Sequence, residues 1–128
     1  MPLRTILVVD DDLGLRDLAV AFLSEPGCTV LTASDGYEAL RVLVERSVDL
    51  LITDVKMPGI SGYDLARQAK LMRPNLHVIY LSGCVSGPDR TGPIYGTLVS
   101  KPIRAGSLLK LIEREMAEAA TSEPWSLN

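Results

Sequence analysis

The sequence predicts an α/β fold, a doubly wound parallel sheet of five strands in the order 2-1-3-4-5. Short apolar runs rich in Val, Ile and Leu alternate with segments whose apolar residues recur at helical spacing. Four of these runs end directly on polar residues, which a parallel sheet brings together at one edge. With 128 residues, the chain is long enough for one domain with a core. The predicted strands cover residues 6–9, 29–33, 49–53, 76–81 and 97–100.

The first two helices are predicted on either side of the second strand. Apolar residues recur at helical spacing over 15–23, and Gly27 then ends that helix. After the second strand, Asp35 and Glu38 form the pattern of a capping box. A second helix therefore begins there and presents an apolar face that includes residues 39–43.

The second half of the chain continues the alternation. A loop signal at 57–59 follows the third strand and precedes a helix over 62–72, which ends at Arg73 and Pro74. A last helix is predicted over 105–119. Residues 1–120 are thus expected to form one domain, followed by a mobile tail over 121–128.

One crossover departs from this alternation. Residues 83–96 hold four glycines and two prolines where a helix is due. In a helix interior each Gly costs ~1 kcal/mol and each Pro ~3 kcal/mol relative to Ala. The fourth helix is therefore predicted to be short or irregular.

Composition excludes several function classes. The net charge is −3 and the isoelectric point is near 5.1, which argues against a nucleic-acid surface. No apolar run approaches the ~20 residues of a membrane span, and no signal peptide is recognisable, so a cytoplasmic protein is expected. Cys28 and Cys84 are expected to be reduced thiols, and His77 to be structural.

The polar residues at the strand ends predict a site for phosphate chemistry. In the expected strand order, the first and third strands are neighbours, so Asp10, Asp11 and Asp54 converge. Such an oxygen-only cluster suits Mg²⁺, with Mn²⁺ as the alternative ion. Lys101 supplies positive charge and Ser82 a hydroxyl at the same edge. Together these groups can form an aspartyl phosphate.

The chain resembles a response-regulator receiver domain over residues 4–117, in the flavodoxin-like fold. The motifs that carry the resemblance are residues 8–12, 54–59 with Gly62, 81–83 and 101–102. Their joint order and spacing are specific, although each motif alone is weak.

The resemblance implies a role for each site residue. Asp54 is the implied phosphoacceptor and Asp11 a direct Mg²⁺ ligand, while Asp10 acts mainly through water. The Lys56 backbone carbonyl is implied to complete the protein's share of the coordination. Asp12 is expected to be a helix N-cap rather than a ligand.

Three further residues, which follow the fourth and fifth predicted strands, have implied roles at the same edge of the sheet. Ser82 is implied to bind the phosphoryl group and to report its arrival. Lys101 is implied to pair with a phosphoryl oxygen. The peptide bond before Pro102 is expected to be cis.

Two departures from the family concern the part of the domain through which receivers usually signal. The connection from Ser82 to Lys101 is shorter than usual, and Leu98 stands where receivers mostly carry a switch Tyr or Phe. Tyr95 is the nearest aromatic that could take this role. Our hypothesis is that phosphorylation orders or releases residues 82–96.

Two further positions are expected to modulate the lifetime of the phosphate. Lys56 and Cys84 lie two residues beyond Asp54 and Ser82, at positions that flank the attacking water in the family. The alternative for Lys56 is a side chain that points into solvent.

The predicted function is that of a single-domain response regulator and not of an enzyme in the classical sense. It would accept a phosphoryl group from a histidine kinase or a phosphotransfer protein and signal through protein contacts. Two alternatives within the family are a receiver excised from a hybrid kinase or larger regulator, and a pseudo-receiver that works without phosphorylation.

Two alternatives from other classes fit the sequence less well. A flavin mononucleotide site would need a phosphate loop after the first strand, where three aspartates repel phosphate. A phosphatase with an aspartyl nucleophile would need a cap domain, for which this sequence has no segment.

Overall fold

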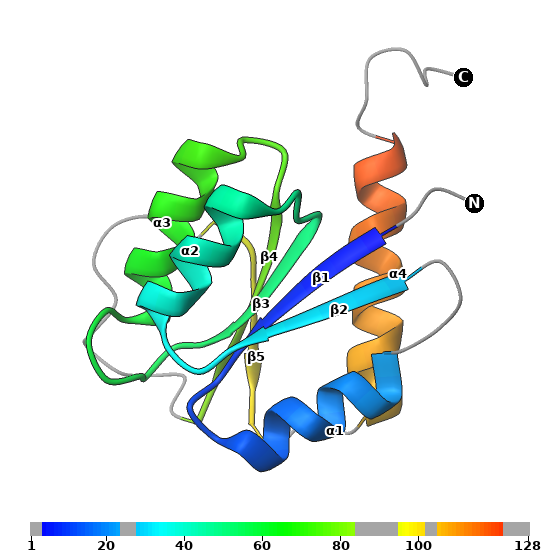
Figure 1. Cartoon of the computed structure of the whole chain (residues 1–128). Helices are drawn as coiled ribbons and strands as arrows, with labels where there is room; N and C mark the ends of the chain where they lie inside the picture. The colour runs from blue at the N-terminus through cyan, green and yellow to red at the C-terminus, as the bar shows by residue number, and fades with distance from the viewer. Residues whose placement is uncertain (1–3, 24–27, 84–94, 102–104, 122–128) are drawn as a thin grey trace.

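The computed structural model of the chain describes residues 4–23, 28–83, 95–101 and 105–121 (Figure 1). It contains a five-stranded, all-parallel sheet in the order β2-β1-β3-β4-β5, which confirms the predicted order. The strands are β1 Arg4–Val9, β2 Cys28–Ala33, β3 Leu50–Asp54, β4 His77–Ser82 and β5 Thr97–Ser100. The helices are α1 Leu13–Leu23, α2 Gly36–Glu45, α3 Gly62–Met72 and α4 Ala105–Thr121. The prediction of a short or irregular helix falls on residues that lie mostly outside the described ones.

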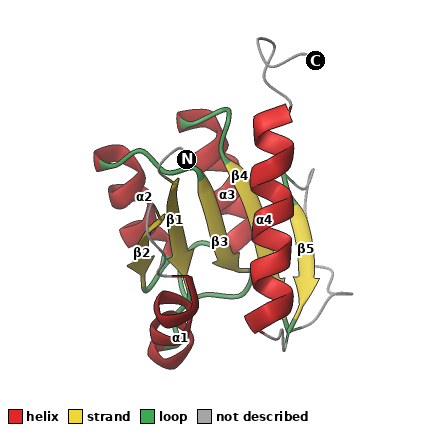
Figure 2. Ribbon diagram, turned by 90° about the vertical axis from the view of Figure 1, so that its right-hand side faces the viewer, coloured by secondary structure: helices red, strands yellow, loops and turns green. Residues whose placement is uncertain are grey.

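The helices cover both faces of the sheet. Figures 1 and 2 show α2 and α3 on one face and α1 and α4 on the other. This double cover explains why the strands are apolar without alternation, since side chains on both faces are buried.

Two clusters of buried side chains form the core. The first cluster joins the sheet to α2 and α3, and its members include Leu7, Leu51, Val78, Tyr80, Leu43 and Leu65. The second cluster joins the sheet to α4, and its members include Ile6, Ile52, Ile79, Ile112 and Met116. Full burial of a side chain of this size stabilises the fold by about 1.5–3 kcal/mol.

The N-cap half of the capping box predicted for the second helix is present. Asp35 is the N-cap of α2, and its Oδ1 accepts a hydrogen bond of 2.8 Å from the Glu38 N–H. The Glu38 carboxylate in turn accepts from the Ser34 hydroxyl at 2.9 Å. The first bond satisfies a free backbone donor at the start of α2, and the second links α2 to the residue that follows β2.

The single histidine, His77, contacts a carboxylate of α4. His77 Nδ1 lies 3.2 Å from Oε2 of Glu115, a buried carboxylate of α4. Glu115 also accepts a hydrogen bond from the Thr97 hydroxyl at the start of β5. These contacts join α4 to two strands. Cys28, the first residue of β2, is half-buried, whereas Cys84 lies outside the described residues.

Within the part of the chain that the structure describes, no helix is both long and apolar enough to cross a membrane.

Candidate functional site

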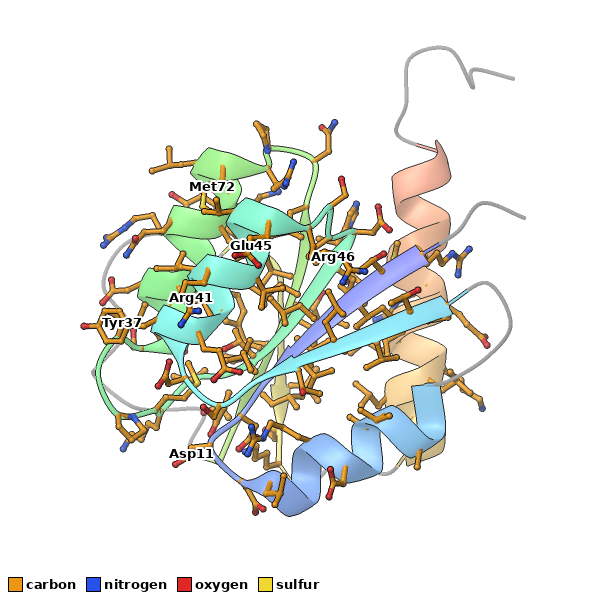
Figure 3. The ribbon with its side chains drawn as sticks, in the orientation of Figure 1. Asp11, Tyr37, Arg41, Glu45, Arg46 and Met72 are labelled. Atoms are coloured by element: carbon orange, nitrogen blue, oxygen red, sulfur yellow. The ribbon has the colours of Figure 1, made fainter. Side chains whose placement is uncertain are left out.

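Three carboxylates meet at the carboxyl ends of β1 and β3. One carboxylate oxygen each from Asp10, Asp11 and Asp54 lie within 4.8 Å of one another. The pairing of Val9 with Thr53 explains this convergence, because it makes both strands end at the same level. Asp10 is 3 % exposed and Asp54 8 % exposed, whereas Asp11 faces solvent (Figure 3). The cluster is thus open on the side of Asp11.

Asp10 is held in place by two hydrogen bonds. Its Oδ1 accepts from the Asp12 N–H at 3.0 Å, and its Oδ2 accepts from Lys101 Nζ at 3.1 Å. Each oxygen of this buried carboxylate therefore has a donor. Asp12 itself caps α1, because its Oδ1 accepts from the Gly14 N–H at 2.8 Å, as expected from the sequence.

Lys101 reaches the cluster from the end of β5. Its backbone N–H donates to the Ser82 carbonyl at 2.7 Å, which extends the ladder between β4 and β5 by one step. Its Nζ lies 3.4 Å from Asp54 Oδ1, in addition to its contact with Asp10. One ammonium group thus serves two carboxylates.

The surroundings change the proton affinity of Asp54 and Lys101. Burial raises the pKa of Asp54 above its ordinary value; the charge of Asp10 adds to this rise, while Lys101 opposes it. Burial alone would lower the pKa of Lys101, but its hydrogen bond and attraction to Asp10 and its attraction to Asp54 raise it overall. The lysine is therefore firmly charged, and it offsets part of the repulsion between the Asp10 and Asp54 carboxylates.

This donor set fits a divalent cation. Mg²⁺ binds oxygen ligands at 2.0–2.1 Å in octahedral geometry, so that adjacent ligand oxygens lie about 3 Å apart and opposite ones about 4.2 Å apart. The three carboxylate oxygens of the cluster all lie within 4.8 Å of one another, a limit slightly above the larger of these separations. A cation would also oppose the rise in the pKa of Asp54, which burial causes and to which the charges of Asp10 and Asp11 add.

The structure places the other predicted residues around this cluster. Ser82 is buried at the end of β4, and Lys56 is exposed in the loop between β3 and α3. Lys56 borders a shallow surface cleft with Met57, Pro58 and Gly59. Pro102 and Cys84 lie outside the described residues, so the expectations for them stay untested.

Leu98, at the position where the resemblance implies a switch aromatic, is packed against the core. Leu98 packs against the core next to Tyr80, its partner in β4. The Tyr80 hydroxyl accepts a hydrogen bond of 3.1 Å from the Tyr95 N–H. The rings of Tyr80 and Tyr63 lie 5.2 Å apart between centroids, at 47°. Burial raises the pKa of Tyr80, so its hydroxyl stays neutral.

Sequence reasoning missed two residues near the site. Tyr80 could have been found from strand alternation, because it shares a face with Ser82 two residues later. Thr53 was treated as the end of an apolar run, yet its side chain is fully buried and donates to the Asp54 carbonyl at 2.9 Å.

Comparisons with known proteins identify relatives of this chain. The model of the response regulator receiver domain matches residues 6–113. The response regulator receiver protein CpdR of Brucella abortus is 31% identical over 120 residues, which cover 91% of this chain and 100% of CpdR. The transcriptional regulatory protein GlrR of Escherichia coli is 34% identical over 125 residues, which cover 94% of this chain but only 28% of GlrR.

Solved structures show the same similarity. A CheY-like receiver domain protein from Methanospirillum hungatei superposes with a TM-score of 0.80 at 27% identity, covering 91% of this chain and 96% of that one. The response regulator TrrA from Thermotoga maritima, in complex with Mg²⁺ and BeF, superposes with a TM-score of 0.76 at 29% identity. That match covers 88% of this chain and 98% of TrrA.

Proposed function

The chain belongs to the response regulator receiver domain family, and on that premise we propose that Asp54 accepts a phosphoryl group in a Mg²⁺-dependent reaction. Receiver domains are signalling domains of two-component systems rather than classical enzymes. The observation that carries the proposal is the joint approach of Asp10, Asp11 and Lys101 to the Asp54 carboxylate. The phosphoryl donor is a phosphohistidine of a kinase or a phosphotransfer protein.

The residues of the cluster are proposed to coordinate the metal in different ways. Asp11 and Asp54, with the Lys56 backbone carbonyl, are proposed as direct ligands. Asp10 is proposed to act through water, which agrees with its two existing hydrogen bonds. When bound, Mg²⁺ neutralises charge on the phosphoryl oxygens. The TrrA complex with Mg²⁺ and BeF supports this choice of metal.

Asp54 is proposed as the nucleophile. One of its carboxylate oxygens forms a bond to phosphorus as the bond between phosphorus and the histidine nitrogen breaks, and the imidazole leaves with that electron pair. Lys101 keeps its positive charge and pairs with a phosphoryl oxygen, since its Nζ already lies 3.4 Å from Asp54. Ser82, buried at the neighbouring strand end, is proposed to donate its hydroxyl to another phosphoryl oxygen.

The output is proposed to be a contact with a protein. The match over the whole length of CpdR supports the single-domain form of such a regulator. GlrR contains the matched region as about a quarter of its length, and its whole-protein activity is not carried over. The phosphoacceptor proposal for Asp54 is the same in either form.

Incubation with acetyl phosphate and MgCl₂, followed by intact-mass measurement, tests the proposal. We expect an adduct of one phosphoryl group on the wild type and no adduct on Asp54→Asn. The matched control is Asp17→Asn, an exposed aspartate on α1, which should react like the wild type. An Asp54→Asn variant that still gains the adduct would show that another residue is the acceptor.

Removal of the metal provides a separate test. Because a ligand that binds only the folded state stabilises it, Mg²⁺ should raise the melting temperature of the wild type, and EDTA should reverse this. The Asp11→Asn variant should gain much less from Mg²⁺, whereas Asp17→Asn should gain as much as the wild type. Equal gains in all three proteins would contradict the assignment of Asp11 as a ligand.

A further inference from the structure

We propose that Thr53 is a positioning residue for Asp54, whose backbone it fixes through a buried hydrogen bond. The inference rests on the proposed function, because it concerns how the phosphoacceptor is aimed. In this proposal Thr53 contacts neither the carboxylate oxygens that would bind the metal nor the phosphoryl group. It acts only through the peptide group of Asp54.

The first observation is the hydrogen bond itself. Thr53 lies in the central strand β3, between Val9 of β1 and Tyr80 of β4, and its side chain is 0 % exposed. Its Oγ1 donates to the Asp54 carbonyl oxygen at 2.9 Å. A hydroxyl that is fully buried needs a hydrogen-bond acceptor, and the Asp54 carbonyl provides one.

The second observation explains why that carbonyl needs a donor. The Val55 N–H donates to Leu81 of β4, and successive backbone groups of a strand face opposite neighbours. The Asp54 carbonyl therefore faces the side of β1, whose last residue, Val9, pairs one step earlier with Thr53. The ladder between β1 and β3 thus stops just before Asp54, and the Thr53 hydroxyl takes the place of the missing donor from β1.

The third observation is a steric limit at the same carbonyl. A Cβ built on Gly62, the first residue of α3, would lie 2.2 Å from the Asp54 carbonyl oxygen. The Gly62 N–H donates to the Val55 carbonyl at 2.8 Å, which keeps α3 at this distance. The Asp54 peptide is therefore held by a hydrogen bond from Thr53 and by close packing of Gly62.

The consequence concerns the aim of the Asp54 side chain. The direction of a side chain follows from the orientation of its own backbone, so a fixed peptide sets the carboxylate relative to Lys101 and Asp11. Reaction rates depend steeply on such placement, since a shift of ~1 Å can cost about 100-fold. Loss of the Thr53 hydroxyl leaves the carbonyl unsatisfied and favours a shift of the strand end toward other donors.

Substitutions that separate the hydroxyl from the shape of the side chain test the inference. Thr53→Val keeps the shape without the hydroxyl, whereas Thr53→Ser keeps the hydroxyl. The control is Thr32→Val, a strand threonine of β2 that is distant from Asp54 in the sheet order. For each protein, the rate of adduct formation is measured by intact mass across acetyl phosphate concentrations, at saturating Mg²⁺.

We expect Thr53→Val to lower the rate constant at saturating acetyl phosphate about tenfold, with Thr53→Ser and Thr32→Val within about twofold of the wild type. A wild-type rate in Thr53→Val would overturn the inference, as would a loss that Thr53→Ser shares. If Thr53→Val does not fold, Thr53→Ser and Thr53→Ala are compared instead. The rate constant of adduct formation is then expected to be about tenfold higher for Thr53→Ser. A wild type that forms no adduct would contradict the proposed function itself, so the two failures are distinguishable.

Discussion

Lys101 Nζ lies 3.1 Å from Asp10 Oδ2, which joins the end of the last strand to the end of the first across 91 positions of sequence. The strands β1 and β5 are not neighbours, so the lysine side chain spans the ends of β3 and β4 to make this contact. The same ammonium lies 3.4 Å from Asp54. The pair therefore lies across the carboxyl edge of the sheet, beside Asp54.

Removal of the lysine should destabilise the protein. In Lys101→Met the buried Asp10 carboxylate loses its cationic partner, and hydrogen bonds to charged groups are worth about 1.5–3 kcal/mol. Because the Lys101 side chain is 24% exposed, we expect the lower end of that range. Urea unfolding measures the loss, with Lys110→Met, an exposed lysine of α4, as the control. Equal losses in the two variants would contradict a specific role of the pair.

Neutralisation of Asp54 should stabilise the protein in a pH-dependent way. Burial raises the pKa of Asp54 above its ordinary value of 3.8, so the folded state binds this proton more tightly than the unfolded chain does. The contribution of Asp54 to stability is therefore fully present below pH 3.8 and is lost as the pH rises through the raised folded pKa. We expect Asp54→Asn to exceed the wild type in unfolding free energy at pH 7 by on the order of 1 kcal/mol.

Urea unfolding in EDTA from pH 3 to pH 7 measures this difference. The gain of Asp54→Asn should shrink as the pH falls and should vanish below the ordinary pKa of the carboxyl group. Asp17→Asn serves as the exposed control. A gain of constant size across the pH range would mean that relief of a buried charge is not its cause.

Loss of the Tyr80 hydroxyl should weaken the start of β5. Tyr80→Phe keeps the ring that packs against Tyr63 but removes the acceptor of the Tyr95 N–H. We expect a loss of ~1 kcal/mol in unfolding free energy and roughly fivefold faster amide exchange at Tyr95. Tyr63→Phe, on the facing ring, should leave that amide unchanged. Unchanged exchange in Tyr80→Phe would show that the bond does not hold Tyr95 in solution.

Glu115 should be important for the attachment of α4. Its buried carboxylate accepts from Thr97 and lies 3.2 Å from His77 Nδ1, so Glu115→Ala leaves two polar groups without their partner. We expect a loss of about 2 kcal/mol in unfolding free energy, and a smaller loss for Glu115→Gln, which keeps an acceptor for Thr97. Glu113→Ala, an exposed position on the same helix, is the control for helix propensity. A similar effect at both positions would contradict the role of the buried contacts.

Local patterns along the sequence were sufficient to predict the architecture. The apolar runs identify the strands, and the alternation with helices predicts a parallel sheet in the observed order. The strand bounds differ from the predicted ones by only a few residues. For example, β1 begins at Arg4 and β2 begins at Cys28. Strand ends depend on pairing with neighbours, which the sequence of one strand does not contain.

The convergence of the site residues was also predictable. Asp10, Asp11 and Asp54 follow two strands that end at the same edge, and Lys101 follows a third. The sequence did not show how they share their contacts. Both Asp10 oxygens already have donors while Asp11 faces solvent, and this difference depends on the path of the chain after β1.

The sequence by itself determined the family, the strand order and the edge at which the polar residues meet, because these follow from residue types and their spacing along the chain. Only the tertiary structure decided which side chains pair across elements. The bonds from Tyr95 to Tyr80 and from Thr97 to Glu115 depend on strand register and helix placement. The hydrogen bond from Thr53 to the Asp54 carbonyl joins adjacent residues, yet its importance arises because β1 ends at Val9 and leaves that carbonyl without a strand partner.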